Sequence, residues 1–254
     1  MLETILAVKK QELQQLYLPE EQQTTRRSLR DSLLESPYIA GLIAEVKKAS
    51  PSKGIIREDF NPTQIAADYN QAGVQAISVL TDQHFFQGHR DFLTTIKQNV
   101  DVPILRKDFI IDPVQVVESA YIGADAILLI GEALEARQLH ELYNQAYDLG
   151  MEALVEVHSE ETLDRVLNEF TPRIVGVNNR NLHTFETKLS QTERMASLVP
   201  EESLLVSESG IVNYEDVQDV VEYGAKAILV GESLMRQNQI VEGVQRLMNG
   251  VGES

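Results

Sequence analysis

The sequence contains no cysteine and no tryptophan, and it has no long hydrophobic run. Without cysteine the chain cannot form disulfide bonds, thiolate metal sites or a cysteine nucleophile. No run reaches the roughly 18 apolar residues of a membrane span, and the N-terminus lacks a basic segment followed by an apolar one. We therefore expect a cytoplasmic protein with no membrane partner.

Positive charge is also scarce. The chain has 22 Lys and Arg against 39 Asp and Glu, which gives a net charge of −17. A surface of this sign repels phosphodiester backbones, so we expect no nucleic-acid partner. An anionic small molecule would have to be held by a local group of cationic side chains.

The first 40 residues differ in pattern from the remainder. Apolar residues recur at helical spacing over Leu2–Leu18, with Gln and Lys on the opposite face, and Pro19 follows. A polar loop is expected over 20–27 and a second short helix over 28–34. Because this segment has too few apolar residues for its own core, we interpret residues 1–40 as an extension packed on a main domain at 41–254.

From Gly41 onward, short apolar runs alternate with amphipathic segments. The runs are Gly41–Val46, Ala76–Leu80, Pro103–Leu105, Ala126–Ile130, Ala153–Val157, Arg173–Val177, Leu204–Val206 and Ala227–Val230. The segments between them include Pro62–Ala72, Asp112–Ile122, Glu135–Leu149, Ser159–Phe170 and Asn213–Tyr223. These units predict the α/β class, with a parallel sheet closed as a single (β/α)8 TIM barrel. An open doubly wound sheet is the alternative, but no Gly-x-Gly-x-x-Gly or Walker lysine loop supports it.

Polar side chains stand at the C-terminal ends of several runs. Glu45 and Lys47 share one strand face, and Lys107 shares a face with Leu105, because side chains alternate along a strand. Strands buried on both faces should be apolar, and burying an unpaired charge is costly. Barrel enzymes keep their active sites at this end. The predicted site residues are Glu45, Lys47, Lys107, Glu156, Asn178 and Glu208, whereas Arg106 and Asp108 should point outward to the helices.

The last two strand ends carry glycine and serine. Ser209-Gly210 follows the seventh run, and Gly231-Glu232-Ser233 follows the eighth at the start of an expected helix. Glycine lets backbone N–H groups approach a ligand, and a helix N-terminus favours an anion. The loops after strands seven and eight are the usual phosphate site of barrel enzymes. We therefore predict phosphate binding at Gly210, Gly231 and Ser233.

Taken together, these segments resemble the indole-3-glycerol phosphate synthase family. The resemblance rests on Glu45-Val46-Lys47, Ala49 to Gly54, Leu80-Thr81-Asp82, Phe85 to Gly88, Ile104 to Phe109, Val155 to His158, Gly176 to Leu182, Ser207 to Ile211 and Leu229 to Met235. It implies a barrel with an N-terminal helical extension. It also implies conversion of 1-(2-carboxyphenylamino)-1-deoxyribulose 5-phosphate to indole-3-glycerol phosphate, with loss of carbon dioxide and water, in tryptophan biosynthesis. No metal or organic cofactor is implied.

The resemblance also implies residue roles. Lys107 would be the general acid in ring closure, Glu156 the acid/base partner in dehydration, and Lys47 a contact to the anionic substrate that can supply a proton. Glu45 and Asn178 would orient these groups. The substrate-binding residues would be Ser50, Phe86, Phe109, Arg180, Glu208 and Ser209. His89 replaces the family's usual serine at an expected helix cap, and the other histidines, His84, His140, His158 and His183, are expected to be structural.

Two other functions fit the same residues. One is a Schiff-base aldolase with Lys107 as nucleophile, which borohydride would trap with its substrate. The other is a phosphate-binding barrel without catalysis, although binding alone does not require a set of carboxylates. The sequence does not determine the oligomeric state, and a monomer that binds a small anionic sugar phosphate is the simplest expectation.

Overall fold

The computed structural model describes residues 1–181, 184 and 186–250. Eight parallel strands form a closed barrel in the order β1-β10-β9-β8-β7-β6-β5-β4, and β4 pairs back to β1. They are β1 (Gly41–Val46), β4 (Ala76–Leu80), β5 (Ile104–Lys107), β6 (Ala126–Ile130), β7 (Glu152–Val157), β8 (Ile174–Asn178), β9 (Leu204–Glu208) and β10 (Ala227–Val230). The predicted TIM barrel is confirmed.

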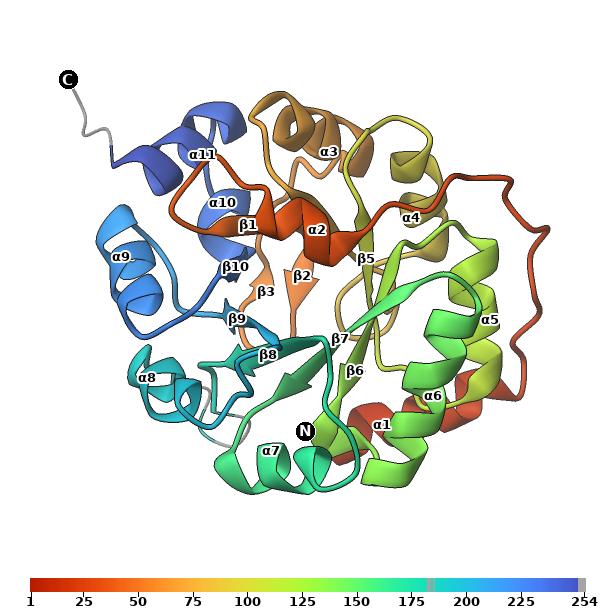
Figure 1. The fold of residues 1–254 in the computed structure, drawn as a ribbon. Helices are drawn as coiled ribbons and strands as arrows, with labels where there is room; N and C mark the ends of the chain where they lie inside the picture. The colour runs from red at the N-terminus through yellow and green to blue at the C-terminus, as the bar shows by residue number, and fades with distance from the viewer. Residues whose placement is uncertain (182–183, 185, 251–254) are drawn as a thin grey trace.

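Helices surround the barrel as a ring (Figure 1). They are α3 (Pro62–Gln71), α4 (Arg90–Lys97), α5 (Pro113–Tyr121), α6 (Ala136–Asp148), α7 (Glu160–Leu167), α8 (Ser190–Ala196), α9 (Tyr214–Glu222), α10 (Glu232–Met235) and α11 (Ile240–Asn249). A 3-10 turn, η1 (Gly131–Ala133), follows β6, and a small antiparallel pair, β2 (Ala49–Ser50) with β3 (Gly54–Ile55), lies in the loop after β1.

Local sequence explains where these helices begin. The side chains of Asn61, Asp112, Ser159 and Asn213 each accept a hydrogen bond from a backbone N–H in the first turn. His89 does the same for α4, where Nδ1 accepts from the N–H of Asp91 at 3.2 Å. The histidine therefore still caps this helix, as the sequence predicted for its position.

Strand side chains divide into an outer and an inner set. Leu42, Ala44 and Val46 face the helices and belong to the large core between strands and helices. Ile43 and the equivalent residues of the other strands fill the barrel interior, which is a second apolar cluster. The inward side becomes polar only toward the strand C-termini, where Glu45 follows Ile43 on the same face.

The extension reaches both ends of the barrel. Helix α1 (Leu2–Leu13) is shorter than the predicted Leu2–Leu18, and the chain then runs without a helix to α2 (Leu29–Leu34). In Figure 1 α2 lies in front of the barrel and α1 lies behind its lower right part. Leu29 and Leu33 of α2 are fully buried and close the interior cluster at the N-terminal ends of the strands.

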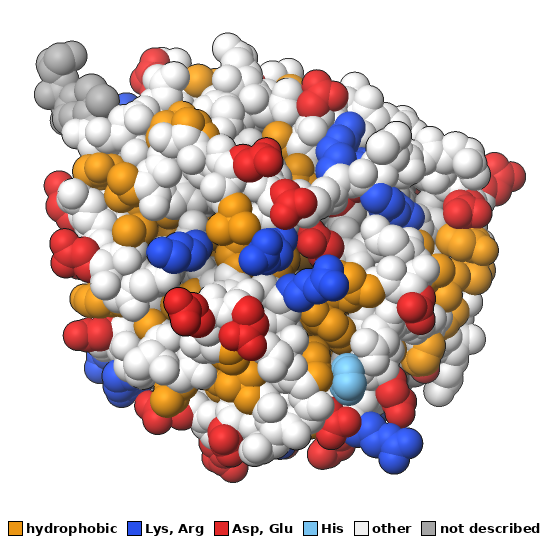
Figure 2. Space-filling model, viewed as in Figure 1, with side chains coloured by type: hydrophobic (Ala, Val, Ile, Leu, Met, Phe, Trp, Pro, Cys, Tyr) orange, Lys and Arg blue, Asp and Glu red, His pale blue; other side chains and the backbone are white. Residues whose placement is uncertain are grey.

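The end of the molecule that α2 covers is shown in space-filling form in Figure 2. Acidic side chains are spread over this face and around its edge, and several basic side chains lie among them across its middle. None of the helices in the described part of the chain is long and apolar enough to cross a bilayer.

Candidate active site

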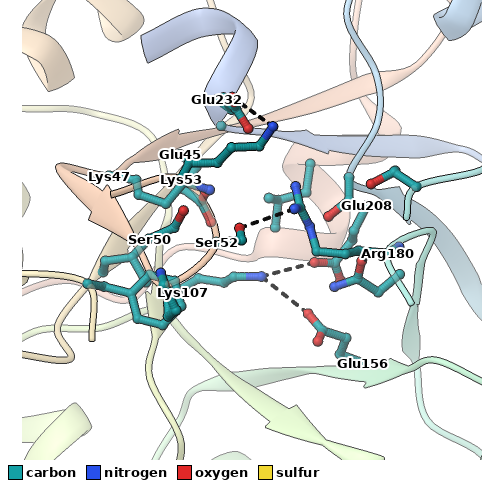
Figure 3. Close-up of a pocket in the computed structure, with 18 of the residues that line it drawn as sticks. Glu45, Lys47, Ser50, Ser52, Lys53, Lys107, Glu156, Arg180, Glu208 and Glu232 are labelled. Carbon is teal, nitrogen blue, oxygen red and sulfur yellow. Dashed lines mark hydrogen bonds and ion pairs between the residues drawn. The ribbon is translucent and has the colours of Figure 1, made fainter. Parts of the chain in front are cut away.

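The opposite end of the barrel holds a cavity of about 510 Å³. All six strand-end residues predicted from the sequence line it: Glu45, Lys47, Lys107, Glu156, Asn178 and Glu208. The alternation of each strand carries them inward, so charged groups at the ends of β1, β5, β7 and β9, together with the amide of Asn178 on β8, converge above an apolar interior (Figure 3).

Lys107 of β5 lies between two carboxylates. Its Nζ is 3.2 Å from Oε2 of Glu156 on β7 and 3.0 Å from Oε2 of Glu208 on β9. The lysine side chain is 12% exposed, and both glutamates are more deeply buried. Burial alone would lower the pKa of Lys107, but the charges of Glu208, Glu156 and Glu45 outweigh it and raise the pKa above its ordinary value. The ammonium therefore keeps its proton at neutral pH.

Glu156 and Glu208 share the same cation but ionise differently. For Glu156 the charges of Lys107 and His158 overcome the effect of burial, and the pKa falls to about 2. For Glu208 burial dominates and the nearby Glu156 adds to it, so the pKa rises to about 8. Oε1 of Glu208 is buried without a hydrogen-bond partner among the described residues. The pair therefore holds one carboxylate and one neutral acid near pH 7.

Glu45 of β1 and Lys47, the residue after the end of β1, form a second ion pair beside this one. Glu45 is buried, yet the charges of Lys47 and Lys107 lower its pKa below the ordinary value. Gly231 lies directly against the pair, because a Cβ placed there would come within 2.2 Å of Glu45 Oε1 and 2.9 Å of Lys47 Nζ. This glycine makes room for the ion pair as well as standing in a predicted phosphate loop.

The remaining predicted contacts line the walls of the cavity. The rings of Phe86 and Phe109 lie together, with centroids 6.1 Å apart. Arg180 donates to Ser52 Oγ at 3.4 Å across the mouth, and its backbone N–H donates to Asn178 Oδ1 at 3.0 Å. Ser50 lies on the same side as Lys47. These groups provide an apolar slot beside a cationic rim.

The predicted phosphate loops also reach the cavity. Ser209 and Gly210 have positive φ values of 68° and 84°, so the chain makes a left-handed turn after β9. Asn179 supports this turn by donating to the carbonyl of Ser209 at 3.0 Å. Ser233 Oγ donates to the carbonyl of Ile211 at 3.0 Å, which joins the two loops. All of Ser209, Gly210, Gly231 and Ser233 line the cavity.

Comparison with known proteins agrees with this geometry. The family described as indole-3-glycerol phosphate synthase matches residues 2–247. The chain is 60% identical over 254 residues to indole-3-glycerol phosphate synthase of Priestia megaterium, covering 100% of this chain and 98% of that protein. It is 54% identical over 250 residues to the enzyme of Halalkalibacterium halodurans, with 98% and 97% covered. The chain belongs to the indole-3-glycerol phosphate synthase family.

As a member of this family, the chain has the activity of an indole-3-glycerol phosphate synthase, a ring closure with decarboxylation in tryptophan biosynthesis. Solved structures of lower identity share the fold alone. One is 3-hexulose-6-phosphate synthase from Salmonella typhimurium, with a TM-score of 0.66 at 12% identity, covering 82% of this chain and 96% of that one. Another is N-acetylmannosamine-6-phosphate 2-epimerase from Clostridium perfringens, with a TM-score of 0.64 at 14% identity, covering 87% and 97%.

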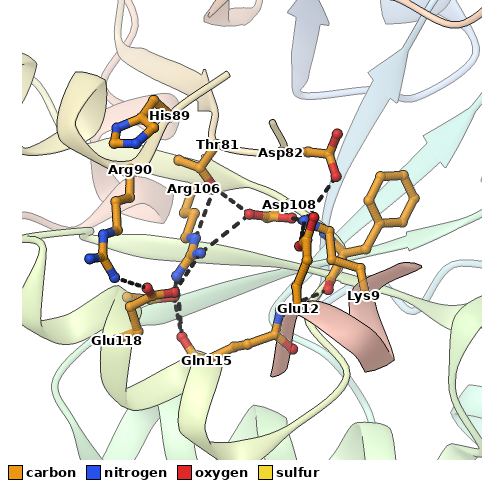
Figure 4. A network of polar contacts seen from close by, with 12 residues as sticks. Lys9, Glu12, Thr81, Asp82, His89, Arg90, Arg106, Asp108, Gln115 and Glu118 are labelled. Carbon is orange, nitrogen blue, oxygen red and sulfur yellow. Dashed lines mark hydrogen bonds and ion pairs between the residues drawn. The ribbon is translucent and has the colours of Figure 1, made fainter. Parts of the chain in front are cut away.

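Within this synthase barrel, Lys9 has a buried position beside the site that the sequence did not indicate. The helical pattern placed the lysines of α1 on a solvent face, but Lys9 is 3% exposed. Its Nζ is 2.8 Å from Asp82 Oδ2 and 2.8 Å from Asp108 Oδ1, both beyond strand ends (Figure 4). Burial opposes the charge of Lys9, yet the two aspartates raise its pKa above the ordinary value. The ion pairs dock α1 at the mouth.

Asp108 belongs to a network that also contains Arg106. Arg106 reaches the helix α5, as predicted, whereas Asp108, predicted to face the helices, also lines the cavity because it follows the end of β5. Arg106 contacts Asp108 at 3.2 Å and Glu118 of α5 at 2.8 Å. Arg90 of α4 also pairs with Glu118, and its guanidinium lies 4.3 Å from the ring centre of Tyr17 in the extension. The network therefore attaches the extension at two points, on the loops that carry Phe86 and Phe109.

The docked helix forms part of the cavity wall. Met1, Leu2 and Ile5 line the cavity, and Ile5 is buried. The sequence predicted an extension that packs on the barrel, and these residues place its first turns in the wall of the cavity that Lys107 and Glu156 also line. A helical spacing in the sequence could not show this, since the two aspartate partners of Lys9 lie more than 70 residues further along the chain.

His158, predicted to be structural, lines the same cavity. Its ring contacts Glu156 and also Glu132 of η1, a residue that sequence reasoning did not single out. His84 and His140 pair with Glu12 and Glu169 and do not line the cavity. The prediction for His183 lies outside the described residues.

Proposed function

We propose that Lys107 is the general acid of indole ring closure in this barrel and that Glu156 is its acid/base partner. The observation that carries the proposal is the position of Lys107 Nζ, within 3.2 Å of the carboxyl groups of Glu156 and Glu208 at the centre of the cavity. A lysine with a raised pKa arrives at the reaction protonated. It can then donate to the ketone oxygen while the aromatic carbon attacks.

The later steps use the other charged groups. After the carbon–carbon bond forms, loss of carbon dioxide restores the aromatic ring, and the hydroxyl group leaves as water once it is protonated. Glu156 accepts or returns protons in this dehydration, and Lys47 binds the anionic substrate and can supply a proton. Glu45 and Asn178 orient these groups, and Glu208 and Ser209 line the substrate pocket.

The same contacts argue against the two alternatives. A Schiff-base lysine must lose its proton to attack a carbonyl, and the carboxylates around Lys107 oppose that loss. A barrel that only binds phosphate would not need Glu156 and Glu208 deep in its cavity, because burying carboxylates is costly. We expect no covalent adduct when borohydride is added with substrate, measured by intact mass, and an adduct on Lys107 would favour the aldolase.

The substrate's phosphate belongs, in this proposal, at the loops of Gly210, Gly231 and Ser233. A left-handed turn after β9 and the start of the short helix α10 both line the cavity there, and backbone of this kind can present N–H groups to an anion. We expect inorganic phosphate to inhibit competitively against substrate. Gly210→Ala should weaken this inhibition and raise KM, because its Cβ would meet Thr187 Cγ2 at 2.4 Å and distort the turn. Unchanged inhibition in this variant would contradict the assignment.

Replacing Lys107 with methionine tests the central role. Lys107→Met removes the proton and the charge but keeps much of the stem, so kcat should fall by about 10²–10⁴-fold. The dissociation constant of the substrate should change much less, because its phosphate is held elsewhere. Lys226→Met is the matched control, since Lys226 is exposed just before β10 at the other end of the barrel. Equal activity in the two variants would exclude Lys107 as the acid.

We also propose that the enzyme is a monomer and that it acts in the cytoplasm. Its support is that one chain supplies every residue assigned to the cavity, and that the family acts in tryptophan biosynthesis. Light scattering of the active enzyme should give the mass of one chain, and a dimer mass at assay concentration would contradict this. Cell fractionation that finds the enzyme in a membrane fraction would contradict the location.

A further inference from the structure

The ring of His158 is held between two carboxylates at the edge of the cavity. Nδ1 is 3.0 Å from Glu132 Oε2, and Nε2 is 3.4 Å from Glu156 Oε1. The backbone N–H of His158 also donates to Glu132, at 2.7 Å from Oε1. Glu132 therefore fixes both the backbone and the ring of His158, and it leaves Nε2 directed at Glu156.

The two oxygens of Glu156 consequently have different partners. Oε2 contacts Lys107 and Oε1 faces His158. A carboxylate engaged at both oxygens keeps one orientation, which an acid/base group needs. Lys107 is the partner that gives up its proton in ring closure, so it cannot hold Glu156 ionised throughout the reaction. His158 is placed to do so after that step.

We propose that His158, set by Glu132, is a positioning residue that keeps Glu156 oriented and ionised while Lys107 acts as the acid. The inference rests on the proposed role of Glu156. It replaces the purely structural role predicted for His158 from the sequence. Glu132 acts one contact further away, through the imidazole, and need not touch the substrate.

The charges around His158 favour the protonated ring. Glu132 of η1, Glu156 of β7 and Glu208 of β9 act on it, and burial opposes them. The result is a pKa raised above the ordinary value of His158. Two cations lie further from the ring. Lys107 of β5 contacts Glu156, and Arg165 of α7 donates to the carbonyls of Gly131 and Leu134. From α8, neutral Gln191 donates to the carbonyl of His158.

Substitution by glutamine separates charge from hydrogen bonding. His158→Gln keeps a donor but loses the cation, so kcat should fall by about tenfold at a pH where the wild-type ring is protonated. KM should change by less than about twofold, because the ring does not hold the substrate. The deficit should shrink as pH rises through the pKa of His158, where the wild-type imidazole becomes neutral. His140→Gln is the control, because His140 pairs with Glu169 and stacks on Phe170 outside the cavity.

If the His158→Gln variant folds poorly, a second variant and a spectroscopic measurement still test the inference. Glu132→Gln should lower kcat in the same direction by a smaller factor, since it loosens the ring without removing it. The imidazole of His158, titrated by NMR in the wild-type enzyme, should have a pKa above about 6.5 that falls in Glu156→Gln.

The results distinguish this inference from the role of Glu156. A deficit that is independent of pH, a change confined to KM, or a His158 titration that is unaltered by Glu156→Gln would overturn the inference alone. If Glu156→Gln kept full activity, both the role of Glu156 and the positioning role of His158 would be wrong. A pH-dependent deficit with a midpoint at the NMR pKa would support both.

Discussion

At the scale of single residues, the cavity combines groups whose neighbours set their protonation. The neighbouring carboxyl groups keep Lys107 protonated, and Lys107 keeps Glu156 ionised. Burial, with the charge of Glu156 added to it, raises the pKa of Glu208 and holds it neutral. Of three similar carboxyl groups, those of Glu45 and Glu156 are thus ionised before the reaction and that of Glu208 is neutral. Environment rather than residue type assigns the acid and the bases.

Gly231 gives a residue-scale prediction because its missing side chain leaves space for Glu45 and Lys47. Gly231→Ala would place a Cβ 2.2 Å from Glu45 Oε1, so the ion pair must move. A displacement of about 1 Å in a catalytic group can cost about 10²-fold, and we expect kcat to fall by that order. Steady-state kinetics against Gly243→Ala, where the new methyl meets the flexible side chain of Gln237, would measure it. Equal kcat values would show that the pair tolerates the shift.

Much of the site was predictable at this scale because strand alternation is a local rule. Glu45, Lys107 and Glu156 could be placed on the axis from sequence spacing alone. Lys9 and Glu132 could not, because their roles depend on partners in other units of the barrel. A lysine in an amphipathic helix and a glutamate in a single 3-10 turn are usually solvated, and only tertiary contacts distinguish these two.

At the scale of elements, the two helices of the extension, α1 and α2, pack at opposite ends of the barrel. Helix α2 fills the N-terminal end of the barrel with Leu29 and Leu33. Helix α1 docks at the mouth through one buried lysine and lines the cavity. We propose on this basis that residues 1–40 act as an extension and residues 41–254 as the barrel.

Lys9 provides the prediction for this element. Lys9→Met leaves Asp82 and Asp108 without their shared cation, and breaking a buried ion pair at one partner costs about 3 kcal/mol of unfolding free energy. Activity should also fall, because α1 loses its attachment beside the cavity. Lys10→Met is the control, one residue along the same helix and exposed. Urea unfolding that gives equal free energies for the two variants would show that the Lys9 pairs contribute nothing.

The strands and most helices could be predicted at this scale, and the path of the extension could not. Apolar runs and helix caps such as Asn61 and Asn213 are local signals, because they lie within about ten residues of the strand or helix that they define. The end of α1 at Leu13 is different, because apolar spacing continues to Leu16 and the helix stops earlier. The chain there follows the barrel surface, where tertiary contacts such as Arg90 with Tyr17 decide its course.

At the scale of the whole molecule, buried carboxylates make folding sensitive to acid. The charges of Lys9 and Arg106 overcome burial and hold the pKa of Asp108 at about 2, against 3.8 ordinarily. A carboxyl group whose pKa is lower in the folded protein than in the unfolded chain stabilises the fold at pH values above its unfolded-state pKa. This stabilisation is lost as the pH falls toward the folded-state pKa. Asp108 should therefore contribute about 2 kcal/mol at pH 5 that disappears between about pH 4 and pH 2.

Urea unfolding at several pH values would measure this contribution. Asp108→Asn should be less stable than the wild type at pH 5, and the difference should shrink toward pH 2. Asp101→Asn is the control, because the Asp101 side chain is 97% exposed. A wild-type stability that falls with acid no more steeply than that of Asp108→Asn would contradict the assignment.

The contacts of the extension also have a consequence for folding during synthesis. Lys9 forms ion pairs with Asp82 and Asp108, and the backbone N–H groups of Arg27 and Arg30 donate to the side chains of Asp125 and Glu152. The N-terminal segment is synthesised first, but its contacts cannot all form until the start of β7 has been made. The barrel cannot close until β10 has also been synthesised, because β1 pairs with β10. On the ribosome the extension can thus bind an open half-barrel before the ring closes. Nascent chains ending after α7 should already protect residues 14–28 from protease, whereas chains ending after α3 should not.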